Sequence, residues 1–187
     1  MTEPRFRVLS PEEMTPEQKR VADNIVKGPR GSVRGPFPAL LRSPELADRI
    51  RHLGDYIRFE TEIPPALFEL AILLVARFWT AQYEWQAHQK LALATGLSPK
   101  VAEAIGKGER PEQLSADQTL VYDFASQLLN EKDVDDATYA AMIKRFGEKT
   151  TIDMTSAVGY YSFISMVLNT NRAPIPEGAT PLAPLKR

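Results

Sequence analysis

The sequence contains no cysteine among its 187 residues. Disulfide bonds, thiolate metal ligands and cysteine nucleophiles are therefore excluded. Histidine is scarce as well, since only two are present. Glu69, Glu84 and His88 could together supply three metal ligands, but two histidines without an HExxH motif or a Glu-x-x-His pair argue against a metal site. We expect no metal.

Glycine-rich phosphate-binding loops are also missing from the sequence. No GxGxxG or Walker-type segment precedes a predicted helix. The stretch Gly28-Pro29-Arg30-Gly31 predicts a turn, because its proline removes an N–H donor and no predicted strand leads into it. We therefore expect no nucleotide and no other cofactor.

Neither an excess of one charge nor a long apolar run is present. Lys and Arg number 23 against 24 Asp and Glu, and the net charge is -1, so no electrostatic signal indicates nucleic acid or an anionic membrane as a partner. The longest wholly apolar run, Leu70 to Ala76, is far shorter than the roughly 20 residues that cross a bilayer. The segment Met1 to Arg5 begins without the apolar core of a signal peptide. We expect a cytoplasmic protein that binds a small molecule or a protein.

Almost every segment predicts a helix, and strand-like alternation is missing, so the expected class is all-α with several helices in a single domain. The helix starts carry N-cap residues or prolines, and several stops carry glycine. Six of the expected helices have both ends marked: Thr15 to Gly28, Ser43 to Phe59, Pro64 to Trp79, Ser115 to Asn130, Asp135 to Gly147 and Lys149 to Asn169. Two more lie between the third and the fourth of these. One contains residues 84–88 and ends at Gly96, and a short one starts at Ser98.

The chain divides into three expected parts. Residues 1–62 form an N-terminal helical extension, residues 63–172 the core, and residues 173–187, with four prolines, an extended tail that we expect to strap a neighbour. Within the extension, Lys27 to Pro38 is rich in glycine and proline and predicts a connecting loop. The helix from Lys149 to Asn169 is apolar over much of its circumference, which predicts burial in the core or between subunits.

The motif Glu84-Trp85-Gln86-Ala87-His88 holds a carboxylate and a histidine four residues apart. On a helix this spacing places both side chains on one face, where they can share a proton. A surface ion pair or a hydrogen-bonded core histidine has the same spacing. Trp79, Tyr83 and Trp85 lie nearby in the sequence and favour a partly enclosed pocket, in which we expect them to contact substrate.

Glu69 is the second candidate for acid/base chemistry. It interrupts the apolar stretch from Ala66 to Ala76, where a charge needs a partner or a purpose. It could meet His88 from the adjacent helix. The alternative is a carboxylate in the first helical turn that complements the helix dipole after Pro64-Pro65.

The segment Leu67 to Gly96, with Glu69-Leu70-Ala71-Ile72-Leu73 followed by Tyr83-Glu84-Trp85-x-x-His88, resembles the carboxymuconolactone decarboxylase family. The similarity continues through Gly159-Tyr160-Tyr161 and covers nearly the whole chain. The family comprises lactone decarboxylases and the alkylhydroperoxidase D (AhpD) branch. The resemblance implies an all-helical AhpD-like fold and assembly into trimers or hexamers.

The peroxidase branch carries an upstream glutamate and then Cys-x-x-Cys-x-x-x-His. Glu69 and His88 match the glutamate and the histidine, whereas Ala81 and Glu84 occupy the two cysteine positions. Thiol peroxidation is thereby excluded. The resemblance to the decarboxylase branch implies a cofactor-independent carbon–carbon lyase acting on a small lactone or unsaturated acid. In this hypothesis His88 is the general acid/base, Glu84 its orienting carboxylate or a second acid, and Glu69 a relay partner.

The alternative function is a cysteine-less AhpD-like protein that binds a small molecule or has a structural role. It would lack thiol peroxidase activity. A homo-oligomer, trimer or hexamer, is expected under either hypothesis.

Overall fold

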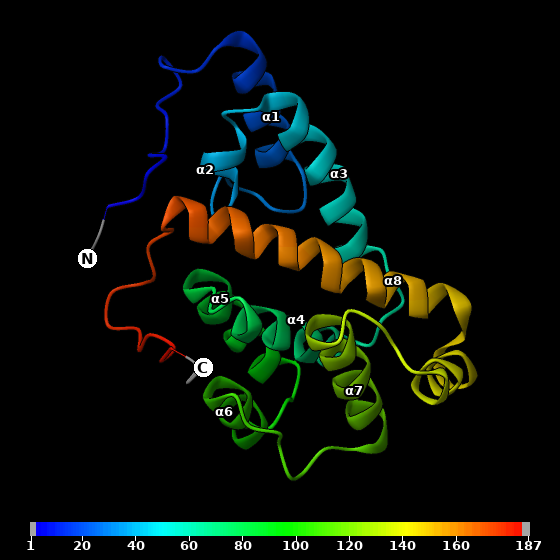
Figure 1. Cartoon of the computed structure of the whole chain (residues 1–187). Coiled ribbons are helices and arrows are strands. Elements are labelled where there is room, and N and C mark those ends of the chain that lie inside the picture. The colour runs from blue at the N-terminus through cyan, green and yellow to red at the C-terminus, as the bar shows by residue number, and fades with distance from the viewer. Residues whose placement is uncertain (1–2, 185–187) are drawn as a thin grey trace.

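The computed structural model describes residues 3–184, which form eight helices and no strand. This confirms the predicted all-α class. The helices are α1 (Pro16–Lys27), α2 (Phe37–Leu40), α3 (Pro44–Phe59), α4 (Pro65–Phe78), α5 (Gln82–Ala94), α6 (Pro99–Lys107), α7 (Ala116–Asn130) and α8 (Asp136–Asn171). Figure 1 shows α1, α2 and α3 on one side of the long α8, and α4 to α7 on its other side.

The helix starts follow from local capping. The hydroxyl of Thr15 accepts a hydrogen bond from the Gln18 backbone, and the Gln18 side chain accepts one from the Thr15 N–H in return. Ser115 and Gln118 form the same reciprocal box at the start of α7. Each box satisfies two N–H groups that would otherwise lack partners.

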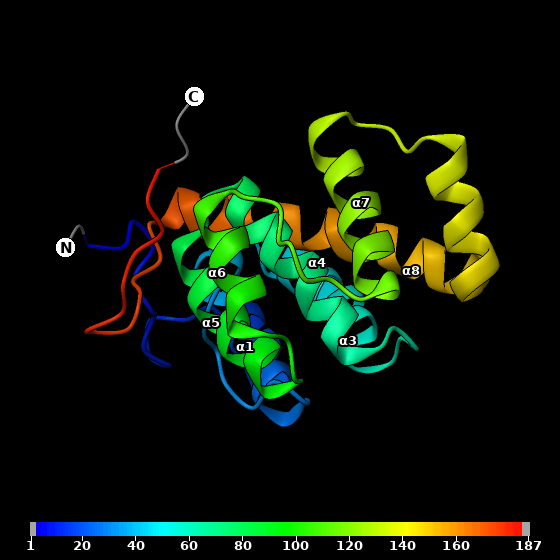
Figure 2. The ribbon, with the colours of Figure 1, turned by 90° about the horizontal axis from the view of Figure 1, so that it is seen from below.

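The centre of the fold is α4, which packs against α5, α6, α7 and α8. All its residues from Leu67 to Arg77 are buried. In Figure 2, α5 and α6 lie on one side of α4 and α7 lies on the other. Because α4 has no solvent-facing side, any charge it carries must find its partner inside the protein. Glu69 is such a charge.

The two helices expected over 135–147 and 149–169 are both present as the two segments of α8, which meet at a kink at Gly147. The bend is made by one residue with φ 80° and ψ 170°, a conformation that side-chain-bearing residues avoid. The segment from Lys149 onward is buried at Ala157, Tyr161 and Leu168, as expected for a core helix, but Ile152 is 64% exposed.

The segment from Lys27 to Pro38 is mostly the predicted loop, but its end enters α2. Phe37, Leu40 and Leu41 are almost completely buried and pack into the core cluster. This anchors the end of the loop against α3 and α8, although Pro29, Gly31 and Arg34 remain exposed. The loop thereby becomes one wall of the cavity described below.

The described part of the tail, residues 173–184, lies along its own chain. The side-chain amide of Gln82 on α5 forms two hydrogen bonds with the backbone of Leu182. It donates to the carbonyl over 2.9 Å and accepts from the N–H over 2.8 Å. Gln86 donates to Thr180 O (2.7 Å) and Arg77 to Ala183 O (2.8 Å). The tail thus straps α5, and the last three residues of the expected tail lie outside the described residues.

None of the helices within residues 3–184 is long and apolar enough to span a membrane.

Candidate active site

The side chain of His88 lies between two carboxylates. Its Nδ1 is 2.7 Å from Oε2 of Glu69, and its Nε2 is 3.1 Å from Oε1 of Glu84. Exposure is 7% for Glu69, 4% for Glu84 and 2% for His88. We call these three residues the acid/base set. Since both ring nitrogens face a carboxylate, neither nitrogen has a free lone pair for a metal ion.

Two helices bring the acid/base set together. The four-residue spacing on α5 stacks Glu84 beneath His88, as the sequence predicts. Glu69 comes from α4, which packs against α5. Burial rules out the surface ion pair for Glu84 and His88, whereas a hydrogen-bonded core histidine has this same geometry. Glu69 lies beyond the first turn of α4 and pairs with His88. Burying three ionisable groups, with His88 paired to both carboxylates, has a large desolvation cost that stability alone does not explain. The three residues are therefore candidates for a functional role.

Burial disfavours the charged imidazole, but two negative charges outweigh it. The charge of Glu84 and the hydrogen bonds to Glu69 and Glu84 raise the pKa of His88 from 6.5 to about 9. His88 is therefore a cation near neutral pH, with an N–H directed at each carboxylate. The set holds a transferable proton when no substrate is present.

Aromatic residues enclose the set on the α8 side. The ring of Tyr161 stands edge-to-face against His88, with centroids 4.9 Å apart and planes at 83°, and it contacts Phe68 and Tyr160 in the same manner. Burial raises the pKa of Tyr161 far above its usual range. The phenol is therefore neutral and contributes a low-dielectric wall that strengthens the ion pairs beside it.

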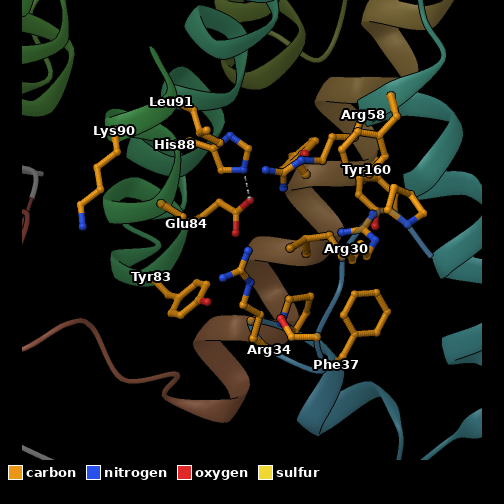
Figure 3. A pocket seen from close by; sticks show the side chains of 18 residues that line it. Arg30, Arg34, Phe37, Arg58, Tyr83, Glu84, His88, Lys90, Leu91 and Tyr160 are labelled. Atoms are coloured by element: carbon orange, nitrogen blue, oxygen red, sulfur yellow. Dashed lines mark ion pairs between the residues drawn. The ribbon is translucent and has the colours of Figure 1, made fainter. Parts of the chain in front are cut away.

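A cavity of about 410 Å³ opens onto Glu84 and His88. Its volume is within the range of small-molecule sites, about 300–1,000 Å³. Its walls come from α5, the C-terminal end of α3, the middle of α8, and the loop between α1 and α2. Figure 3 shows Glu84 and His88 on one wall and Arg30, Phe37 and Tyr160 on the wall across from them. Glu69 is not part of the lining and lies behind His88.

Four cationic side chains line this cavity: Arg30, Arg34, Arg58 and Lys90. Only Arg30 forms an ion pair within the described residues, through Nε to Asp55 at 2.8 Å. In Figure 3 the guanidinium of Arg34 points toward Glu84. Uncompensated cations in a small cavity attract an anionic ligand. These four residues were not predicted from the sequence, although two arginines in a glycine- and proline-rich loop are a signal for an anion-binding site.

The aromatic residues expected to contact substrate are separated by the fold. Tyr83 lines the cavity. Trp85 is 4% exposed and packs against Gly106, where an added Cβ would lie 3.0 Å from the indole. Trp79 lies at the end of α4, where its carbonyl accepts a hydrogen bond from Asn169. Neither tryptophan is part of the cavity wall, so only Tyr83 is placed for substrate contact.

Across residues 3–184 there is no group of three His, Asp or Glu side chains arranged to hold a metal ion.

No family model matches the chain, and no curated protein matches its sequence. Solved structures do match. An AhpD-core, peroxidase-related protein from Ralstonia eutropha JMP134 has a TM-score of 0.74 at 15% identity, covering 95% of this chain and 94% of that one. A peroxidase-related protein from Silicibacter sp. TM1040 has a TM-score of 0.75 at 16% identity, covering 95% and 96%.

A third structural match is a cysteine-to-alanine variant of the debrominase Bmp8 in complex with 2,3,4-tribromopyrrole. Its TM-score is 0.69 at 14% identity, and the match covers 94% of both chains. At such identities the likeness establishes the fold. The chain has the AhpD-like all-helical fold, and the resemblance seen in the sequence is confirmed at that level.

Proposed function

We propose that this protein is a cofactor-independent acid/base enzyme acting on a small lactone or unsaturated carboxylic acid, with decarboxylation or a double-bond shift as the reaction. The observation that carries the proposal is a buried carboxylate–imidazole–carboxylate set that opens onto a cavity lined by unpaired cations. The AhpD-like fold and the sequence resemblance to lactone decarboxylases support the same chemistry.

The geometry favours a division of roles different from the one expected from sequence. Both nitrogens of His88 are engaged, so its ring is not free to contact substrate directly. Glu84 lines the cavity and is paired to Nε2 of His88. We assign proton transfer with the substrate to Glu84, the store of the proton to His88, and the orientation of His88 to Glu69.

The cationic side chains in the cavity indicate that the substrate carries a negative charge. Arg34 and Arg58 have no ion-pair partner within the described residues. Arg34 comes from the loop between α1 and α2 and points toward Glu84, and Arg58 comes from the end of α3. Guanidinium groups bind carboxylates through paired, charge-assisted hydrogen bonds. We assign them to a carboxylate of the substrate that is not changed in the reaction.

The decarboxylation balances with one proton. The bond between the substrate carbon and its departing carboxylate breaks, carbon dioxide leaves, and the electron pair moves through the conjugated system onto the carbonyl oxygen. The proton on Nε2 of His88 passes to Glu84 and from Glu84 to the enolate carbon, and His88 takes a proton from water after the product leaves. In the alternative double-bond shift, Glu84 removes a proton at one carbon and the same set returns it at another.

The test is turnover of gamma-carboxymuconolactone and related lactones by the wild type, Glu84→Gln and His88→Ala. We expect each substitution to lower kcat by about 10²-fold or more. His52→Ala is the matched control, because it removes the other histidine, whose side chain is 69% exposed, and it should retain wild-type kcat. Equal rates in all four proteins would refute the proposal.

A second candidate function is ligand binding without turnover, as a cysteine-less AhpD-like protein. The pairing within the acid/base set favours binding without turnover, because both ring nitrogens of His88 already have carboxylate partners when no substrate is bound. Calorimetric binding of the same lactones, with no product formed over hours, would select this function over the first. Hydroperoxide consumption with a thiol reductant should be absent in both cases.

A further inference from the structure

The wall across the cavity from Glu84 carries two hydrogen-bond donors that the roles above do not use. They are Arg30, from the loop between α1 and α2, and Tyr160, from α8. Figure 3 shows both side chains on the wall that lies across the cavity from Glu84 and His88.

Arg30 is held in place on two sides. Its Nε donates to Oδ1 of Asp55 over 2.8 Å, with the two side chains only 14% and 12% exposed. Its guanidinium carbon lies 5.2 Å from the centroid of the Phe37 ring. Nη2 is buried and has no hydrogen-bond partner among the described residues. A fixed, partly unsatisfied guanidinium is costly in the absence of an anion.

Tyr160 brings its hydroxyl to the same place. A Cβ added to Gly54 would overlap the Tyr160 hydroxyl and would lie 2.6 Å from Nη2 of Arg30, so both groups converge over this glycine. Burial raises the pKa of Tyr160 to about 12, against the opposing charge of Arg30. The phenol therefore keeps its proton at neutral pH and can donate it in a hydrogen bond.

We propose that Arg30 and Tyr160 form an oxyanion site, which receives the negative charge that develops on the carbonyl oxygen of the substrate. The proposal rests on the proposed function and names two further catalytic residues for it. Both groups keep their protons throughout, while the electron pair released by the departing carboxylate moves onto the oxygen they contact. The proton that ends on carbon comes from the opposite wall.

The pair differs from Arg34 and Arg58 in what it can stabilise. A carboxylate that is unchanged in the reaction is bound equally well in the ground and transition states, which lowers KM without raising kcat. Donors fixed at an oxygen that gains charge act mainly on the transition state. The Asp55 ion pair and Phe37 supply the necessary rigidity, since they leave the Arg30 guanidinium little freedom to reorient.

The experiment combines kinetics with anion binding. The variants are Arg30→Gln and Tyr160→Phe, with Arg49→Gln as a control that removes one positive charge from an ion pair whose arginine side chain is 78% exposed. We expect kcat on gamma-carboxymuconolactone to fall by about 10²-fold in Arg30→Gln and by about tenfold in Tyr160→Phe, with smaller changes in KM and none in Arg49→Gln. Gly54→Ala, whose added Cβ would overlap the Tyr160 hydroxyl and displace both groups, should match Arg30→Gln.

A binding measurement separates this proposal from the proposed function. Oxalate, a small dianion whose negative charge lies on its oxygens, is titrated into each protein by calorimetry. Affinity that falls at least tenfold in Arg30→Gln and Tyr160→Phe but not in Arg49→Gln supports the oxyanion site, even if no lactone is turned over. Equal oxalate affinity in all variants overturns it. So does turnover that depends on Glu84 while both variants keep kcat within twofold of the wild type. Far-UV circular dichroism confirms folding, and Tyr160→Phe, which removes a single oxygen, keeps the test valid if Gly54→Ala does not fold.

Discussion

The strongest prediction concerns the protonation of His88 and its effect on stability. The folded protein raises the pKa of this imidazole from 6.5 to about 9. One unit of pKa corresponds to about 1.4 kcal/mol, so the favourable interaction of the charged ring with Glu69 and Glu84 contributes about 3 kcal/mol to folding at low pH. Because the folded state binds the proton more tightly than the unfolded chain, this contribution is complete below pH 6.5. It is lost as the pH rises to 9 and beyond.

Two measurements test this. Urea unfolding of the wild type should show the free energy of unfolding falling by about 3 kcal/mol between pH 6 and pH 10, and Glu69→Gln should lose much of that dependence because one of the two partner charges is gone. The chain has only two histidines, so the proton signals of their imidazoles can be followed directly by NMR, with His52→Asn assigning which is which. A midpoint for His88 below pH 7, or a stability that does not depend on pH in this interval, would refute the reasoning.

Three further predictions follow from other parts of the fold. Gly147→Ala should lower the free energy of unfolding by about 1–3 kcal/mol, because φ is 80° and ψ 170° at this residue. Gly159→Ala should raise the free energy of unfolding by up to about 1 kcal/mol, because Gly159 lies in the regular part of α8 with open space around it. Equal effects of the two substitutions in denaturant melts would contradict the backbone argument. Leu182→Ala should lower stability by about 2 kcal/mol, since this tail residue is only 9% exposed, and a melting temperature identical to wild type would show that the tail contributes nothing. We also predict a trimer-based assembly, as the sequence resemblance implies. Leu53, Phe59 and Ile152, which are 46%, 47% and 64% exposed, are apolar side chains that such an assembly would cover. Sedimentation as a monomer at micromolar concentration would disprove it.

Local signals predicted most of the secondary structure. Thr15 and Ser115 mark helix starts through hydrogen bonds that involve residues only three positions away, so the chain segment itself contains the information. The break predicted at Gly147 is present as a kink between two helical segments of α8, and this glycine has non-helical dihedral angles, φ 80° and ψ 170°. Residues with a side chain avoid that conformation, so this signal is local as well.

The acid/base set was predictable because its spacing and its burial are both visible in the sequence. Glu84 and His88 are four residues apart, and Glu69 interrupts an apolar stretch, so a meeting between them was anticipated and is observed at 2.7 Å and 3.1 Å. The cationic wall was not predictable in the same way. Arg30 and Arg34 reach the cavity because Phe37 anchors their loop into a core made by distant helices, and that packing depends on the whole fold.

The two walls of the cavity have different evolutionary freedom. The acid/base wall is carried by α4 and α5, where Glu69 and His88 are embedded in close packing and most substitutions would reduce stability. The opposite wall is carried largely by a surface loop, and surface loops accept substitutions and changes of length with little effect on the core. Under the proposed function, we expect substitutions within residues 29–36 to alter which anionic ligand this protein binds while the acid/base set stays unchanged.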